Sequence, residues 1–300
     1  MTRRRANALV VAGVVAAGAL VASVAALAIS RGSDPTRCPT GMVALGARCC
    51  GEGQHLEQTD HGPRCAGAPQ ACARGLEVTA VGCVAPETRV VLPAGTLRIG
   101  PGDWEAAGIE RREAVMPAFA IDAYEVTEAR WQRCVEAGKC APAAAGGGGA
   151  GEPGLPVTDK TLREAEALCA WAGGRLASAN ELAWAAAGAA GRRYPWGDTG
   201  AVCRRAVWAM VDGPCAHDAR GPDLAGSRPD GASPEGVFDL AGNVAEWAQD
   251  EGGRAEVRGG TYRDEAAARL RSWNRRDASA ELRSPEVGFR CTYAASPPAP

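Results

Sequence analysis

The side chains that could carry chemistry are unevenly represented in this chain. Cysteine is abundant, with 12 residues, whereas histidine is limited to His55, His61 and His217. A cysteine can form a disulfide, bind a soft metal or act as a nucleophilic thiolate. No convincing Ser/His/Asp or Cys/His set accompanies these cysteines, because His217 is the only candidate base beyond residue 87 and belongs to a polar loop. Nucleophilic catalysis assisted by histidine is therefore not indicated.

A second group of candidate residues is charged. Asp264, Glu265, Arg269 and Arg271 lie close together in the sequence and could line a cleft that binds a hard metal through oxygen ligands. A run of charges is more often one solvated face of a protein. The solvated face is the simpler interpretation.

The N-terminal residues indicate the cellular compartment in which the cysteines are located. Arg3 to Arg5 precede an apolar run from Ala8 to Ile29, and about 20 apolar residues span a bilayer. Because basic residues precede this run and no basic cluster follows it, we expect a transmembrane helix with its N-terminus in the cytoplasm. Residues 26–28 could instead be the cleavage site of a signal peptide. The bulk of the chain is then anchored to the inner membrane facing the periplasm, or secreted, and its cysteines can pair.

Composition argues against some partners. The apolar content of 46% is sufficient for a hydrophobic core, and the net charge is −2 with no long run of one sign. Nucleic-acid binding is not indicated, because it needs a basic patch. The expected partners are the membrane, through the N-terminal helix, and an unknown exported peptide, protein or glycan.

The chain divides into four parts by composition. Residues 1–30 are the anchor or signal segment, 31–86 a cysteine-rich module, 87–293 a large domain, and 294–300 a proline-rich tail that we expect to be disordered. So small a module buries little core and relies on covalent links. Its cysteines are Cys38, Cys49, Cys50, Cys65, Cys72 and Cys83.

The pairing within this module is not fixed by the sequence. Six cysteines allow 15 connectivities, and we expect only that the neighbours Cys49 and Cys50 have different partners. A zinc site that uses His55 and His61 is the alternative, and the absence of a C-x-x-C pair disfavours it. Nothing in the module specifies a ligand.

The large domain is predicted to contain both strands and helices. Residues 90–99, with a turn at 93–95, and residues 119–126 have the composition of strands. A helix is expected from Thr127, a good N-cap, to Gly138. We expect two further helices, over 158–172 and from the capping-box residue Ser178 to about Gly188.

Two further cysteine pairs are suggested by proximity in the sequence. Cys134 and Cys140 could close a local loop at the end of the first helix. Cys203 and Cys215 are a plausible pair in a loop-rich segment. Because the cysteine count is even, we expect no free thiol.

Four phrases in the large domain resemble a known family. They are Ala120-Ile121-Asp122-Ala123-Tyr124-Glu125-Val126-Thr127, Trp171-Ala172-Gly173-Gly174-Arg175-Leu176, Gly242-Asn243-Val244-Ala245-Glu246-Trp247, and Arg258-Gly259-Gly260-Thr261-Tyr262 continuing to Gly288-Phe289-Arg290-Cys291. In this order they resemble the formylglycine-generating enzyme (sulfatase-modifying factor) family over roughly residues 88–293. The resemblance implies an α+β, loop-rich domain of C-type-lectin-like type.

The resemblance also implies a framework. The family joins the positions of Cys169 and Cys291 by a disulfide. It binds calcium through the positions of Asp239 and Glu246 and the carbonyl groups of Gly242 and Val244, so structural calcium is the expected cofactor. A second family calcium site follows the Tyr-Pro-Trp-Gly-Asp phrase, where asparagine is usual; this chain has residues 205–208, Arg-Ala-Val-Trp, there, and we expect the site to be absent.

The catalytic residues of the family are missing. Family members that oxidise cysteine hold copper between two thiolates, and these positions correspond to Asp264 and to Ala268 or Arg269. The family serine is Thr261, and the tryptophan usual after Gly-Asn-Val is Ala245. Neither a carboxylate nor a guanidinium holds Cu(I), which prefers soft ligands. We therefore expect no copper, and a single histidine cannot form the three-histidine iron centre of related sulfoxide synthases.

These observations lead to three hypotheses about function. The first is a binding or structural protein that is exported, tethered to the membrane and inactive in formylglycine formation. The second is an enzyme, either an oxidase of the formylglycine-generating type or one that modifies another exported protein with a different metal. The third assigns the function to the cysteine-rich module, with the large domain as its support.

Overall fold

The structure is a computed structural model that describes residues 38–46, 48–59, 62–100, 111–142, 152–216 and 221–295. The apolar run at residues 8–29, His61, His217 and residues 296–300 lie outside these ranges. Within the described ranges, no helix is both long and apolar enough to cross a membrane.

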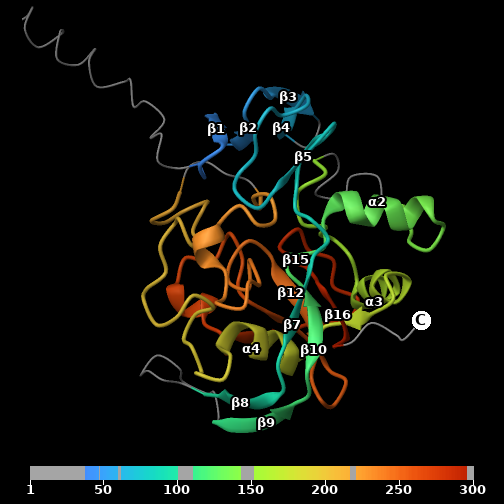
Figure 1. The fold of residues 1–300 in the computed structure, drawn as a ribbon, viewed down its shortest axis with the longest axis vertical. Helices are drawn as coiled ribbons and strands as arrows, with labels where there is room; N and C mark the ends of the chain where they lie inside the picture. Colours follow the sequence, from blue (N-terminus) through green and yellow to red (C-terminus); the bar gives the residue numbers. More distant parts are fainter. Residues whose placement is uncertain are drawn as a thin grey trace, which may run out of the picture. The chain divides into compact units, whose positions relative to one another are not determined.

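The cysteine-rich module is a set of three short hairpins closed by disulfides (Figure 1). Its bonds are Cys38–Cys49, Cys50–Cys65 and Cys72–Cys83, so the neighbours Cys49 and Cys50 do have different partners. With every cysteine of the module in a disulfide, no thiolate is left for zinc. The strands are β1 (Met42–Leu45), β2 (Arg48–Gly51), β3 (His55–Thr59), β4 (Gly62–Ala66), β5 (Glu77–Thr79) and β6 (Gly82–Val84).

The module shares a hydrophobic cluster with the large domain. Met42 and Cys83 pack with Leu155 and Leu224, all of them buried. Tyr124 adds a contact from the domain, since its hydroxyl donates a hydrogen bond to the carbonyl oxygen of Gly75 at 3.5 Å. The two parts belong to one compact unit. The module is therefore a disulfide-linked extension of the domain and not a separate domain.

Two four-stranded sheets form the centre of the domain. The first has the order β11-β16-β10-β7 and is antiparallel throughout. The second has the order β14-β13-β12-β15, in which β12 and β15 are parallel. Their bounds are β7 (Arg89–Leu92), β10 (Phe119–Asp122), β11 (Arg175–Leu176), β12 (Ala245–Gln249), β13 (Ala255–Arg258), β14 (Arg275–Asp277), β15 (Val287–Gly288) and β16 (Cys291–Ala294).

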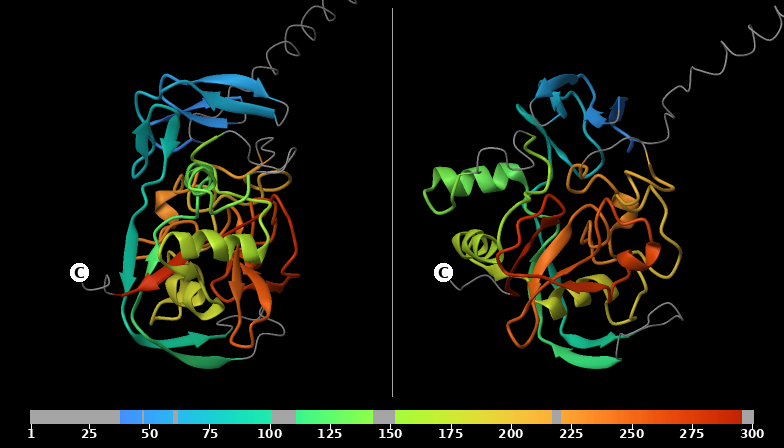
Figure 2. Two further views of the ribbon diagram at one scale, coloured as in Figure 1. Left: turned by 90° about the vertical axis from the view of Figure 1, so that its right-hand side faces the viewer. Right: turned by 180° about the vertical axis from the view of Figure 1, so that it is seen from behind.

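The polypeptide leaves the first sheet in the long hairpin of β8 (Gly95–Ile99) and β9 (Arg112–Met116). This hairpin lies at the end of the domain opposite to the cysteine-rich module (Figure 2). The turn at Pro93 predicted from the sequence separates β7 from β8, and the Pro93 carbonyl oxygen accepts a hydrogen bond from the Trp184 indole. The described part of the domain is mostly β with few helices, and much of it is loop.

Within the described ranges, three α-helices begin at polar N-caps. They are α2 (Glu128–Glu136), α3 (Leu162–Trp171) and α4 (Ala179–Ala187). Thr127 and Ser178 cap α2 and α4 as predicted, whereas α3 begins later than the predicted Thr158. The reason is that Thr161 and Glu164 form a capping box, which competes with the earlier threonine for the helix start. Helices α2 and α3 lie side by side (Figure 2).

Candidate functional site

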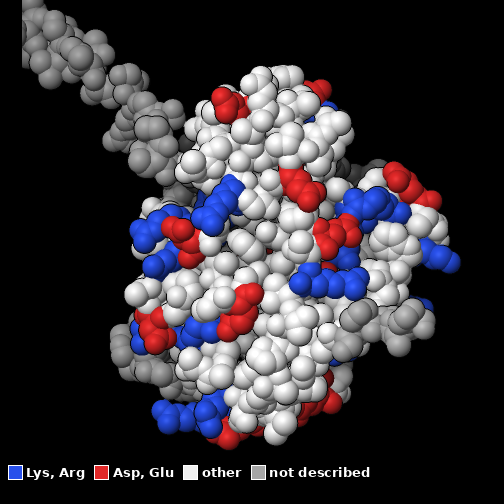
Figure 3. Space-filling view, in the orientation of Figure 1, with Lys and Arg blue, Asp and Glu red and all other residues white. Residues whose placement is uncertain are grey.

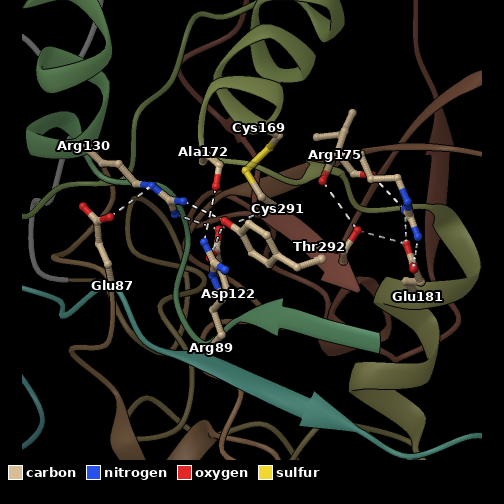
Figure 4. The surroundings of a disulfide bond; sticks show 12 residues. Glu87, Arg89, Asp122, Arg130, Cys169, Ala172, Arg175, Glu181, Cys291 and Thr292 are labelled. Carbon is tan, nitrogen blue, oxygen red and sulfur yellow. Dashed lines mark hydrogen bonds and ion pairs between the residues drawn. A yellow bond between two sulfur atoms is a disulfide. The ribbon is translucent and has the colours of Figure 1, made fainter. Parts of the chain in front are cut away.

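A disulfide between Cys169 and Cys291 fixes the frame on which the candidate site is built (Figure 4). It joins the last turn of α3 to the start of β16 across a sequence separation of 122 residues, and both cysteines are fully buried. The residue before Cys291 is Arg290, which points into the candidate site. The disulfide thus anchors the chain directly after this arginine.

Polar residues around the disulfide are linked to one another by hydrogen bonds. The Asp122 carboxylate accepts hydrogen bonds from Arg130 Nη1 at 2.7 Å, the Tyr293 hydroxyl at 3.0 Å and the Cys291 amide at 3.0 Å. The Arg89 guanidinium lies 3.4 Å from the centre of the Tyr293 ring and donates to the Ala172 carbonyl oxygen. This cluster holds strands and helices together.

A second pair flanks β16 on the other side (Figure 4). The Arg175 guanidinium binds the Glu181 carboxylate through two hydrogen bonds, of 2.5 and 2.7 Å. Glu181 also accepts a hydrogen bond from the Thr292 hydroxyl at 3.3 Å. This contact connects α4 to β11 and β16, and it belongs to the framework.

Three buried carboxylates meet one buried guanidinium at the centre of the domain. Arg290 donates to both oxygens of Glu246, with Nε–Oε2 at 2.7 Å and Nη2–Oε1 at 2.6 Å. The Asp239 carboxylate accepts the Gly226 amide at 2.5 Å. Glu125 accepts hydrogen bonds from the Asn243 side chain and the Val244 amide. The cluster therefore contains more acidic than basic groups.

This excess of negative charge changes the affinity of the carboxylates for protons. Burial raises the pKa of Glu125 well above its usual value, and the nearby charges of Asp239 and Glu246 raise it further. Burial also raises the pKa of Asp239, to about 6. Either protons or a cation can relieve the repulsion between these groups.

The segment predicted to bind calcium has a backbone that suits close packing. Gly242 has φ +83°, and a Cβ there would lie 2.5 Å from the Val207 carbonyl oxygen. Asp239 and Asn243 are also in the left-handed region, with φ of +54° and +60°, which Asp and Asn tolerate better than most residues. Asn243 then donates its amide to Val207, at 2.7 Å.

The donors in this segment fit a hard cation in their chemistry. Asp239 and Glu246 are buried carboxylates in a cluster with excess negative charge, and calcium prefers oxygen ligands of this kind. Arg290 already neutralises part of the charge of Glu246. In the described residues no group of three or more His, Cys, Asp or Glu side chains is placed to hold a metal ion, but the predicted set needs only two carboxylates and two carbonyl groups. Calcium at this site remains a prediction.

The turn from Thr261 to Asp264, next to the positions of the missing catalytic cysteines, is held by a hydrogen bond within the turn. The Asp264 carboxylate accepts the Thr261 amide at 2.8 Å, which is the role of a turn-capping residue. Thr261 is 1% exposed, and its hydroxyl lies 3.3 Å from Glu286. Arg263 pairs with the same glutamate at 3.4 Å. Thr261 is therefore inaccessible as a nucleophile.

The four charged residues considered from the sequence as lining a cleft differ in their exposure. Arg269 is exposed, whereas Arg271 is only 7% exposed. Ala268 belongs to the short helix η2 (Ala267–Leu270), which packs close to Gly260: a Cβ on that glycine would lie 2.8 Å from the Arg269 carbonyl oxygen. Asp264, Glu265, Arg269 and Arg271 thus do not share one environment, and a cleft lined by them stays a prediction.

A loop closed by the Cys203–Cys215 disulfide lies against this turn. Ala209 donates its amide to the Asp264 carbonyl oxygen at 3.0 Å, and Met210 donates to the Tyr262 carbonyl oxygen at 2.9 Å. Met210 and Tyr262 are each 1% exposed and share one hydrophobic cluster. The loop therefore fixes the shape of the turn from one side.

The chain offers no pair of thiolates for copper. All 12 cysteines lie in the described residues, and six disulfides contain all of them. The local pairs Cys134–Cys140 and Cys203–Cys215 suggested by the sequence are both present. Since Asp264 and Arg269 are poor ligands of Cu(I), the residues at this turn do not fit a copper centre.

Comparison with known proteins agrees with this geometry. The family profile of the sulfatase-modifying factor enzyme 1-like domain matches residues 79–295, well over half of the chain. The chain belongs to this family. A search of the curated proteins gave no match.

Solved structures share the sulfatase-modifying factor fold of this chain. PvdO from Pseudomonas aeruginosa has a TM-score of 0.54 and 24% identity, covering 69% of this chain and 94% of PvdO. Treponema denticola variable protein 1 has a TM-score of 0.55 and 17% identity, with coverage of 69% and 94%. CarF has a TM-score of 0.50 and 19% identity, with coverage of 70% and 98%. At these identities the likeness shows the fold.

Several residues of the site were not singled out from the sequence. Glu125, Asn243 and Arg290 stand in the phrases that resemble the family, but no pattern within the chain indicates that they meet. No pattern in the sequence pointed to Glu286 as a residue of the site. Each is brought in by a segment far away in the sequence, so only the fold places it.

Proposed function

We propose that this chain is an exported, membrane-tethered member of the sulfatase-modifying factor family that keeps the scaffold and acts as a binding or structural protein without oxidising cysteine. The observation that carries the proposal is the pairing of every cysteine, which leaves no thiol near Tyr262. The residues at the positions of the copper cysteines also support it, because the Asp264 carboxylate already accepts a hydrogen bond from the Thr261 amide in its own turn.

Export is supported by the six disulfides. Disulfides persist in oxidising compartments and are rare in the cytosol. The apolar run at residues 8–29, which the sequence predicts to be a membrane anchor, would bring the cysteine-rich module next to the membrane surface. Localisation of the full chain by fractionation, with and without residues 1–30, tests this part of the proposal.

Calcium is proposed as a structural ion. Asp239 and Glu246, with the carbonyl groups of Gly242 and Val244, would hold it, and it would offset the excess of buried carboxylates. The ion would hold the loop from Asp239 to Val244 against the start of β12. No catalytic step depends on it.

The face of the molecule shown in Figure 3 has no large basic patch that would suit a polyanionic partner. On the face shown in Figure 3, acidic and basic side chains occur in small mixed groups. Beside the Thr261–Asp264 turn, the half-exposed Arg263 pairs with the partly buried Glu286, and Glu265 is exposed. A neutral or mixed-charge segment of an exported peptide, protein or glycan suits such a surface better than nucleic acid does.

The experiment that tests the loss of copper chemistry is a competition for Cu(I). The full chain is mixed with Cu(I) and a chromophoric chelator, and the chelator should retain the metal. The variant Asp264→Cys/Arg269→Cys restores two thiols to the family positions and is the matched positive control. Tight Cu(I) binding by the unaltered chain would contradict the proposal.

A further inference from the structure

A small cavity lies between helix α4, the second sheet and the segment that follows η2. Leu182 belongs to its apolar wall, and Arg258, Arg271 and Ser272 belong to its polar wall. Each of these four residues is at most 7% exposed. The cavity leaves about 10 Å³ for the centre of a water-sized particle, so it has room for one such particle.

The hydroxyl of Ser272 is a polar group without a use in the fold. It has no hydrogen-bond partner among the residues that the structure describes, although Ser272 is only 6% exposed. The backbone of the same residue is fully engaged, since its amide donates to the Arg193 carbonyl oxygen at 2.8 Å and its carbonyl oxygen accepts from Arg258 Nη2 at 3.4 Å. A buried hydroxyl without a partner indicates a water or an ion in the space beside it.

The charges at the cavity favour an anion over water. Arg258 pairs with Glu256 at 2.7 Å, and Arg275 pairs with the other oxygen of the same carboxylate at 3.2 Å. One buried carboxylate thus serves two guanidinium groups. Glu246 also lines the cavity, but Arg290 binds both of its oxygens and compensates its charge.

The affinity of Arg258 for its proton agrees with this balance of charges. Burial lowers the pKa of the Arg258 guanidinium, Glu256 raises it, and the neighbouring Arg112 and Arg275 lower it again, so that the net direction is down. The buried positive charge is therefore only partly compensated by Glu256. An anion in the adjacent cavity would supply the remaining negative charge.

We propose that this cavity is a binding site for one small monovalent anion of the halide type, held by Arg258 and the Ser272 hydroxyl. Its size suits chloride or bromide and excludes larger anions such as sulfate and phosphate. The anion ties β13 to the segment after η2, immediately before the turn that begins at Gly259. Glu246 borders both this cavity and the predicted calcium segment, but the anion site does not depend on calcium.

The test measures thermal unfolding of the full chain in sodium chloride and in sodium gluconate at equal ionic strength. Gluconate is too large for the cavity, so the comparison separates anion binding from the screening of surface charges. Chloride at about 100 mM should raise the Tm by about 3–5 °C over gluconate, the shift expected for a dissociation constant of about 10 mM. Bromide should act like chloride.

Two variants and a control assign the response to the cavity. Ser272→Ala removes the hydroxyl and should lose most of the chloride response. Ala186→Val fills the cavity from α4 while every charge remains, and it should lose the response too. Ser279→Ala, at an exposed serine, is the matched control and should respond like the unaltered chain.

Two results would overturn the inference. Equal melting temperatures of the unaltered chain in chloride and gluconate would mean that the cavity holds water. A chloride response that both cavity variants retain in full would mean that the ion binds elsewhere. If either variant does not fold, crystals of the unaltered chain soaked in bromide decide: an anomalous peak between Arg258 and Ser272 is expected, and its absence refutes the site.

Discussion

Arg290 and Glu246 form a two-point ion pair in the interior of the domain, with contacts of 2.6 and 2.7 Å and side-chain exposures of 0% and 3%. The arginine also donates hydrogen bonds to the carbonyl oxygens of Asp122, Ala123 and Phe238. One side chain thus joins the end of β10, the loop before β12 and β12 itself.

Replacing this arginine should be costly. In Arg290→Met, three carboxylates remain without a guanidinium, and the free energy of unfolding should fall by about 3–5 kcal/mol. Urea denaturation measures the change. Arg98→Met is the matched control, since Arg98 pairs with Glu113 on the surface and should lose far less. Equal losses in the two variants would contradict the central position of the Arg290–Glu246 pair.

The two classes of disulfide should differ in their effect on stability. Breaking Cys169–Cys291 with a Cys169→Ser/Cys291→Ser variant opens a loop of 122 residues and should cost about 5 kcal/mol in the chain-entropy account. The matched variant Cys134→Ser/Cys140→Ser opens a loop of 6 residues and should cost about 2 kcal/mol. Thermal unfolding ranks the two, and the reverse order would argue against the long-range disulfide as the main covalent tie.

Calcium should stabilise the chain if the segment at Asp239 binds it. Removal of calcium by a chelator should lower the Tm, and Asp239→Ala should lower it too while abolishing the response to the chelator. Asp212→Ala, at an exposed aspartate, serves as the control and should respond like the unaltered chain. If the chelator changes none of the three melting temperatures, the structural calcium is absent.

Stability should fall as the pH rises from about 5 to 8. Burial is the main cause that raises the pKa of Glu128 from 4.5 to about 8, so the folded chain holds a proton there that the unfolded chain has already lost. This contribution is fully present below pH 4.5 and is lost as the pH rises through the folded-state pKa. The raised pKa values of Glu125 and Glu152 act in the same direction.

Glu128→Gln tests this assignment, because glutamine does not titrate. Urea denaturation at pH 5, 6, 7 and 8 should give a shallower decline for the variant than for the unaltered chain. Identical declines would mean that Glu128 is ionised in the folded protein throughout this range.

Local signals in the sequence predicted local structure well. Thr127 and Ser178 mark helix starts because their side chains bind amides only three residues ahead. The same logic fails at α3, where two threonines compete and the one followed by a correctly spaced glutamate, Thr161, wins. The pairs Cys134–Cys140 and Cys203–Cys215 could be predicted from the sequence for the same reason, since each closes a short loop.

Long-range placement could not be read from the chain alone. Cys169–Cys291 and the segment from Asp239 to Glu246 came from the resemblance to a family, not from spacing. That Arg290 pairs with Glu246, or that Asn243 donates to Glu125, depends on how distant segments pack. Burial is what gives Asp239 its raised pKa, and burial belongs to the fold.

The central claim is that the scaffold persists without the family's oxidase chemistry. Its most direct test is mass spectrometry of a Cys-x-Pro-x-Arg peptide after incubation with the full chain, Cu(I) and oxygen. The prediction is an unchanged peptide mass, with folded protein confirmed by its thermal transition in the same sample. Stoichiometric conversion of the peptide cysteine to an aldehyde would show that copper is held by groups other than a cysteine pair, and would contradict the account.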